Sequence, residues 1–251
     1  MLPPTIEKIN VNCSGTNTTH LKVYFIPGIG ADYRLFTHIL LPEGYTPSHI
    51  HWIDPFDNER LSDYAFRLSS QIDQSEPFIL IGLSLGGMMA VEIAKHLDPV
   101  CTIIVSSIPV KTHLPGYFRL AGKLGLGKLV SPSFLKAATT AKHALTSQSA
   151  ANKRLMFDII RAGDNRFIGW AITAVLEWEN EEVPQHFYHI HGTRDEIFPI
   201  GLTTPTHIVE KGDHNFVVSR PEILNQMLKE IILGQQGEQR KQAGQAAQVP
   251  V

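Results

Sequence analysis

A short, wholly apolar run at residues 78–81 leads directly into a glycine-rich turn at 82–87, and a helical pattern follows the turn. A run without polar residues at alternate positions is typical of a strand buried on both faces of a parallel sheet. Other apolar runs rich in β-branched residues alternate with amphipathic stretches along the chain, which predicts helices on both faces of that sheet. We therefore expect an α/β fold with a mostly parallel sheet.

The same patterns predict the individual elements. The predicted strands are residues 22–26, 49–53, 78–81, 101–105, 186–190 and 206–209. Apolar residues at helical spacing predict helices at 61–72, 88–97 and 221–233, and the last of these is followed by Gly234, a frequent helix stop.

Residues 111–183 interrupt the strand–helix alternation. They show helical periodicity without a convincing strand and are too long for one crossover, so we expect a helical cap inserted between two strands. Crossover helices of the main sheet are the alternative. The predicted core is then residues 1–110 and 184–234, and residues 235–251, rich in Gln, Gly and Ala, are predicted to be a disordered tail.

Composition narrows the class of protein. With 251 residues, 43% of them hydrophobic and 18% charged, the chain fits one globular α/β domain with an insertion. A net charge of −2 gives no reason to expect nucleic acid as a partner. The two cysteines, Cys13 and Cys101, suit a reducing compartment, and we find neither a secretion signal nor an apolar run of membrane-spanning length. We expect a cytoplasmic protein.

The turn at 82–87 contains a Gly-x-Ser-x-Gly pattern centred on Ser84, between a predicted strand and a predicted helix. Such a sharp turn exposes the serine hydroxyl, and Gly82 and Gly86 avoid side-chain collisions two positions away on either side. The start of the following helix directs backbone N–H groups at an oxyanion formed there. This context favours a nucleophile over an incidental serine in a glycine-rich turn.

Through this turn and two further motifs, residues 20–234 resemble the α/β-hydrolase-fold superfamily, in particular a serine esterase-like member with a helical cap. Residues 25–32 follow an early strand and resemble the oxyanion loop of that family, although Pro27 stands where members often have His. The resemblance implies that the backbone N–H groups of Ile29 and Leu85 form the oxyanion hole.

The resemblance also implies the chain order serine, acid, histidine. His214 lies in the loop between the last predicted strand and the final helix, where the family carries its catalytic histidine, whereas His207 lies within the strand. Asp195 follows the strand at 186–190 and is the expected acid, with Glu196 and Asp213 as weaker rivals. The implied triad is therefore Ser84, Asp195 and His214.

Two His-x-His pairs, His49/His51 and His189/His191, raise the question of a metal site, because alternation places each pair on one strand face. Neither pair has the spacing of a known metal-hydrolase motif, so we interpret them as structural histidines. No metal and no cofactor is expected.

The implied function is hydrolysis of a carboxylic ester or thioester of a small molecule through an acyl-enzyme. A carbon–carbon bond hydrolase or lyase on the same triad, and a receptor of the same fold without turnover, are the alternatives. Residues 99–157 carry eight basic side chains and no acidic one, which suits an anionic substrate or acidic carrier protein. A solvated helical face, balanced by the glutamates of 177–182, is the interpretation that the sequence favours. The oligomeric state is left open.

Overall fold

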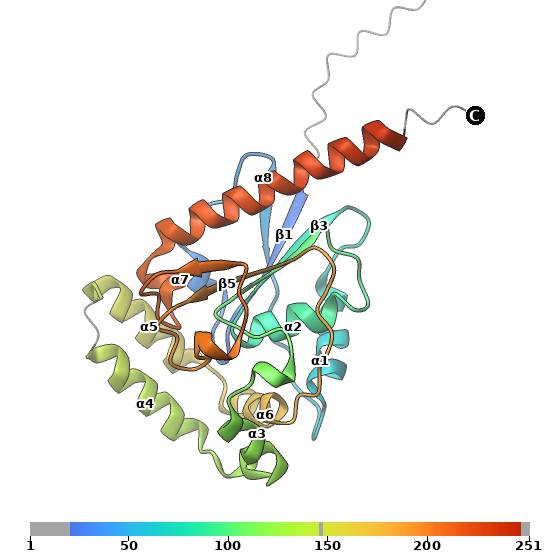
Figure 1. Cartoon of the computed structure of the whole chain (residues 1–251). Helices are drawn as coiled ribbons and strands as arrows, with labels where there is room; N and C mark the ends of the chain where they lie inside the picture. The colour runs from blue at the N-terminus through green and yellow to red at the C-terminus, as the bar shows by residue number, and fades with distance from the viewer. Residues whose placement is uncertain (1–20, 146–147, 247–251) are drawn as a thin grey trace, which may run out of the picture.

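Six parallel strands form the centre of the molecule, in the spatial order β2-β1-β3-β4-β5-β6 (Figure 1). The structure is a computed structural model that describes residues 21–145 and 148–246. The strands are β1 (Leu21–Ile26), β2 (Tyr45–His49), β3 (Phe78–Leu83), β4 (Cys101–Val105), β5 (Phe187–Gly192) and β6 (His207–Val209). The expected parallel α/β fold is confirmed, and β4 occupies the predicted residues.

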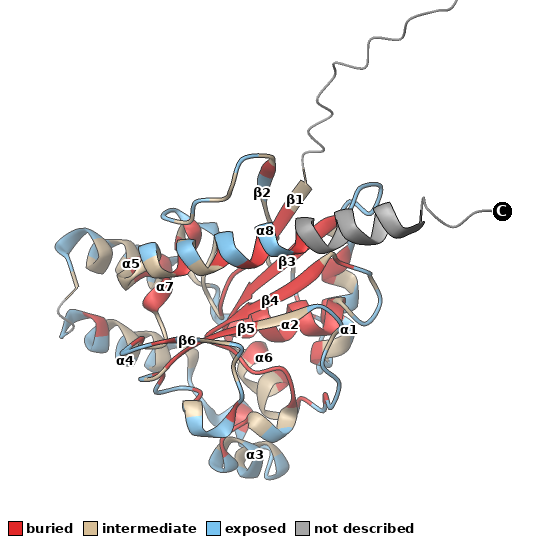
Figure 2. Ribbon diagram, turned by 45° about the horizontal axis from the view of Figure 1, so that its top comes forward, coloured by how far each residue is buried: buried red, intermediate tan, exposed pale blue. Residues whose placement is uncertain are grey.

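Helices pack on both faces of this sheet and beyond the carboxyl ends of its strands. They are α1 (Leu61–Leu68), α2 (Leu85–Ile93), α3 (Gly116–Lys123), α4 (Pro132–Ala144), α5 (Ala150–Ala162), α6 (Asn165–Leu176), α7 (Phe216–Ser219) and α8 (Pro221–Ala246). Successive side chains of a strand point to opposite faces. On β3, Leu80 packs in the apolar cluster with α1, α2 and α6, while Ile79 and Ile81 pack in the cluster with α5, α7 and α8. Figure 2 shows the central strands almost wholly buried between these layers.

The segment that joins β4 to β5 contains α3 to α6 and, among its described residues, no strand. Its helix α6 lies against the loop that follows β1. Gly30 of this loop is so close to Ile168 of α6 that an added Cβ would crowd the Ile168 side chain. Much of α3 and α4 is exposed (Figure 2). The segment therefore packs at the carboxyl ends of the strands.

Strand β2 lies earlier in the chain than predicted, at Tyr45–His49 rather than residues 49–53. The sequence pattern misled because Pro47 weakens the strand signal, yet proline is tolerated on an edge strand such as β2. Beyond the strand, both the amide and the carbonyl of Ile53 bond the hydroxyl of Tyr64 instead of a neighbouring strand.

Helix α8 continues to Ala246, so the predicted helix end at residue 233 is wrong, and α8 extends into the stretch predicted as a tail from residue 235. Gly234 costs a helix only about 1 kcal/mol, and the Gln, Glu, Lys, Arg and Ala residues that follow are good helix formers. Residues 247–251 and Cys13 lie outside the described residues. No helix within residues 21–145 and 148–246 combines the length and apolarity that a membrane crossing needs.

Candidate active site

Ser84 occupies the turn between β3 and α2 with a strained backbone, at φ 53° and ψ −118°. Glycine on either side makes this turn possible. A Cβ on Gly82 would overlap the carbonyl of Gly86, and a Cβ on Gly86 would overlap the carbonyl of Ile26. The local sequence thus permits the sharp turn, and the turn presents the serine at the carboxyl end of β3.

His214 lies between β6 and α7 and bridges two side chains that are far apart in the sequence. Its Nε2 is 3.0 Å from Oγ of Ser84, and its Nδ1 is 3.0 and 2.9 Å from the two carboxylate oxygens of Asp195. A carboxylate accepts hydrogen bonds, so Nδ1 of the ring carries the hydrogen and Nε2 is free to accept from the serine. The structure therefore brings all three predicted side chains into one hydrogen-bonded chain.

Asp195 follows β5 and is only 4% exposed. Its Oδ1 accepts the backbone N–H groups of Ile197 at 2.9 Å and Phe198 at 2.8 Å. Burial alone would raise the pKa of this carboxyl, but the hydrogen bond to His214 and the Phe198 amide outweigh burial and lower the pKa below its usual value. The carboxyl is consequently ionised at neutral pH, as an orienting acid must be.

The rival residues from the sequence lie outside this chain of hydrogen bonds. Glu196 pairs with Lys142 of α4, and Asp213 accepts the backbone N–H of Asn215 at 3.0 Å. Nδ1 of His207 is 2.9 Å from the hydroxyl of Thr206.

The predicted oxyanion donors flank the serine. Leu85 is the first residue of α2, so its N–H has no partner within the helix. Ile29 follows Gly28, whose added Cβ would lie 3.5 Å from Cβ of Ser84, which places this loop directly against Ser84. The turn is closed by a bond from the Ala31 N–H to the Gly28 carbonyl at 3.1 Å, a bond that does not use the N–H of Ile29.

The two His-x-His pairs have different surroundings. The ring of His49 lies among aromatic rings, 5.7 Å from that of Phe25 and 6.1 Å from that of Phe36. His189 and His191 are fully buried beside the acid loop and contact each other. Within residues 21–145 and 148–246, no group of three or more His, Cys, Asp or Glu side chains could hold a metal ion.

Sequence patterns missed two residues that contact the site. Phe198 donates its N–H to Asp195, and its ring packs edge-on against that of His214 with 5.7 Å between centroids. Ser107, after β4, donates its hydroxyl to the carbonyl of Ser84 at 2.6 Å. No periodicity marks either residue, although both closely follow predicted strands.

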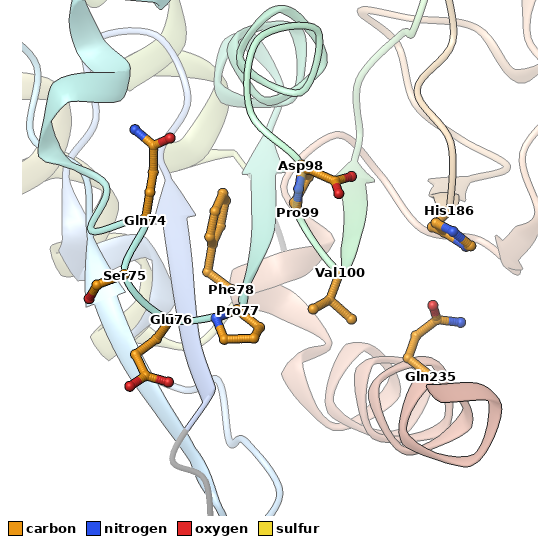
Figure 3. Close-up of a pocket in the computed structure, with 10 residues that line it drawn as sticks. All are labelled: Gln74, Ser75, Glu76, Pro77, Phe78, Asp98, Pro99, Val100, His186 and Gln235. Atoms are coloured by element: carbon orange, nitrogen blue, oxygen red, sulfur yellow. The ribbon is translucent and has the colours of Figure 1, made fainter. Parts of the chain in front are cut away.

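A hollow of about 520 Å³ lies at the amino ends of the central strands β3 and β4 (Figure 3). Its lining includes Phe78, the first residue of β3, and Val100, which precedes β4. Ser84 stands at the other end of β3, so this hollow is separate from the candidate active site.

Comparison with known proteins agrees with this architecture. The model of the alpha/beta hydrolase family matches residues 23–227. The structure of MenH from S. aureus is similar with a TM-score of 0.68 and 14% identity, over 87% of this chain and 95% of that one. A thermophilic esterase from Thermogutta terrifontis gives a TM-score of 0.63 and 14% identity, over 86% and 91% of the two chains. A structure from Nitrososphaera gargenis, reported with carboxylesterases of that organism, gives a TM-score of 0.65 and 14% identity, over 88% of this chain and 93% of that one. No curated protein sequence matches the chain. At these identities the structural likeness concerns the fold.

Proposed function

Since the chain belongs to the alpha/beta hydrolase family, we propose that it is a serine hydrolase that cleaves a carboxylic ester or thioester of a small molecule. The observation that carries the proposal is the unbroken hydrogen-bonded chain from Ser84 through His214 to Asp195. Acyl transfer needs a nucleophile, a base within hydrogen-bond reach of it and a group that orients the base.

In the first half of the proposed reaction, Oγ of Ser84 bonds the carbonyl carbon of the substrate while its proton passes to Nε2 of His214. The N–H groups of Ile29 and Leu85 bind the oxyanion that forms. The imidazolium, stabilised by the Asp195 carboxylate, then protonates the leaving alkoxide or thiolate as the carbon–oxygen or carbon–sulfur bond breaks.

In the second half, His214 removes a proton from water, and the resulting hydroxide equivalent adds to the acyl carbon on Ser84. Collapse of this intermediate breaks the bond to Oγ and releases the carboxylic acid. The serine recovers its proton from His214, so no cofactor is consumed.

Residues 111–183 serve in this proposal as a cap over the core of residues 1–110 and 184–234. Two contacts support that role, since Ile168 of α6 lies against Gly30 of the oxyanion loop, and Lys142 of α4 pairs with Glu196 beside the acid. A cap at this position would exclude water from the acyl-enzyme until the leaving group has departed.

The experiment is a panel of p-nitrophenyl esters and acyl thioesters of graded chain length, assayed with the wild-type protein and Ser84→Ala. Many turnovers by the wild type and none by the variant are expected, together with a fluorophosphonate adduct located on Ser84 by mass spectrometry. A receptor of the same fold would give at most one slow turnover. Equal turnover by Ser84→Ala would exclude the proposed mechanism.

A further inference from the structure

Behind the acid, a second group of polar side chains is buried in a part of the molecule that the proposed reaction does not use. His189 and His191 are two residues apart on β5 and project to the same face of the sheet. Both are fully buried, and Nε2 of His189 is 3.0 Å from Nδ1 of His191. Buried imidazoles at this distance share one hydrogen, so their tautomers are linked.

The carbonyl of Phe198 determines which nitrogen of His191 carries hydrogen. Nε2 of His191 is 2.7 Å from this oxygen, which can only accept, so Nε2 donates. In the neutral ring Nδ1 is then bare and accepts from Nε2–H of His189. Burial lowers the pKa of both rings, that of His189 to about 3, so both are neutral at neutral pH.

Further contacts connect His189 to residues 111–183, the predicted cap. With Nε2 protonated, Nδ1 of His189 is bare and faces the hydroxyl of Thr203 at 3.5 Å. That hydroxyl is also 3.0 Å from Nδ1 of His113, at the end of the short helix Lys111–His113. The contacts therefore connect His113 through Thr203 to His189, and from His189 the hydrogen bonds run through His191 to the carbonyl of Phe198.

Phe198 connects this chain to the triad. Its carbonyl is held by His191, its N–H donates to Oδ1 of Asp195 at 2.8 Å, and its ring packs against His214. His191 does not bond the acid itself, because its Nε2 is 3.6 Å from Oδ2 of Asp195. The hydrogen-bonded link from His191 to the acid therefore passes through the backbone of Phe198, and it acts beside a direct electrostatic attraction between the two side chains.

We propose that His191 is a positioning residue for Asp195: its Nε2–H holds the Phe198 carbonyl and thereby aims the Phe198 N–H at the carboxylate that orients His214. His189 supports this role by donating to Nδ1 of His191, which keeps the hydrogen of His191 on Nε2. The inference rests on the proposed roles of Asp195 and His214. A purely structural His191 would affect stability and leave kcat of the folded protein unchanged.

The first test needs no substrate. In protein labelled with ¹⁵N-histidine, NMR distinguishes a ring nitrogen that carries hydrogen from a bare one, and loss of signals in His189→Gln and His191→Gln assigns the two rings. We expect Nε2 to be protonated and Nδ1 bare in both rings at neutral pH. A cationic His191, or hydrogen on its Nδ1, would overturn the proposal.

The second test separates positioning from stability. His191→Leu removes the donor to Phe198, whereas His191→Gln keeps an N–H near the position of Nε2. We expect kcat of the folded Leu variant to fall about 10- to 100-fold with KM nearly unchanged, and the Gln variant to recover most of this loss. Equal kcat in His191→Leu and wild type would contradict the proposal.

A matched pair of isosteric variants covers the case in which His191→Leu fails to fold. Thr203→Val removes the hydroxyl that faces His189, and it should lower kcat a few-fold and disturb the ¹⁵N signals of His189. Thr102→Val makes the same change at another buried threonine, whose hydroxyl has no hydrogen-bond partner among the described residues, and should change neither. Identical behaviour of the two variants would overturn the proposal. Full activity of Ser84→Ala would instead contradict the proposed function, but it would not affect the NMR result on the tautomers of His189 and His191.

Discussion

The side-chain hydroxyl of Ser107 donates a 2.6 Å hydrogen bond to the backbone carbonyl of Ser84. Ser107 is fully buried and follows β4, so this bond ties the turn after β3 to the neighbouring strand. Gly87 packs so closely that an added Cβ would overlap the Ser107 side chain. The strained backbone of Ser84 is thus held by a residue that follows the neighbouring strand.

Ser107→Ala should therefore weaken the turn. The Ser84 carbonyl also accepts from backbone N–H groups of α2, so we expect a loss of about 1 kcal/mol in the free energy of unfolding, measured with urea, together with a lower kcat. The control is Ser106→Ala, because the buried hydroxyl of Ser106 has no hydrogen-bond partner among the described residues. Equal effects of the two variants would show that the bond to Ser84 is unimportant.

Ser84→Ala and His214→Ala should each lower kcat by about 10⁴- to 10⁶-fold, because the two side chains act as one unit. For the same reason the double variant should be little worse than either single one. Steady-state kinetics on the best ester of the panel measures this, with His207→Ala as the control. Additive losses, or an inactive His207→Ala variant, would contradict a triad of Ser84, Asp195 and His214.

Asp195→Asn should fold but lose about 10⁴-fold in kcat, since an amide stabilises the wrong tautomer of His214. Glu196→Gln and Asp213→Asn make the same chemical change at neighbouring acids whose carboxylates have other partners than the His214 ring. Both should retain near-normal kcat. If one of these two variants is inactive while Asp195→Asn keeps near-normal kcat, that other residue is the acid that orients His214.

Burial of His189 should make folding stability depend on acid pH. The pKa of His189 is about 3 in the folded protein, against about 6.5 for an exposed histidine. Between these values the unfolded chain binds a proton that the folded protein does not, so the free energy of unfolding decreases as pH falls, by up to about 1.4 kcal/mol per pH unit. Urea unfolding across this range should show a shallower slope for His189→Gln. Parallel slopes would mean that His189 is accessible to protons in the folded state.

The basic residues of the helical segment give a prediction on salt. Lys111 pairs with Glu179 and Glu181, whereas Lys123 has no ion-pair partner among the described residues. If these basic residues attract an anionic substrate, kcat/KM for a carboxylated ester falls more steeply with salt than that for a neutral ester, and Lys123→Glu combined with Lys128→Glu flattens the difference.

Lys229→Glu on α8 is the control, because it reverses an exposed charge on another element. Equal salt sensitivity of neutral and anionic esters would mean that the basic residues only solvate the surface.

Local signals in the sequence were sufficient for the parallel sheet and for the turn that carries Ser84. An apolar run without polar residues can only be a doubly buried strand or a buried helix, and glycines at 82 and 86 are required wherever the chain turns this sharply. The resemblance to the α/β-hydrolase fold implied the order serine, acid, histidine, and Ser84, Asp195 and His214 could be assigned to it because each follows a recognisable strand. The structure brings these three side chains together.

Other features depended on neighbours that are distant in the sequence. Strand β2 was misplaced because its pairing with β1, and not its own composition, accommodates Pro47. The bond from Ser107 to Ser84 and the contact of His191 with Phe198 likewise carry no periodic signal. Local sequence patterns indicate which backbone conformations are sterically allowed and which face of a segment is buried. The hydrogen-bond partner of a buried polar group is decided only when strand order and register place two distant segments side by side.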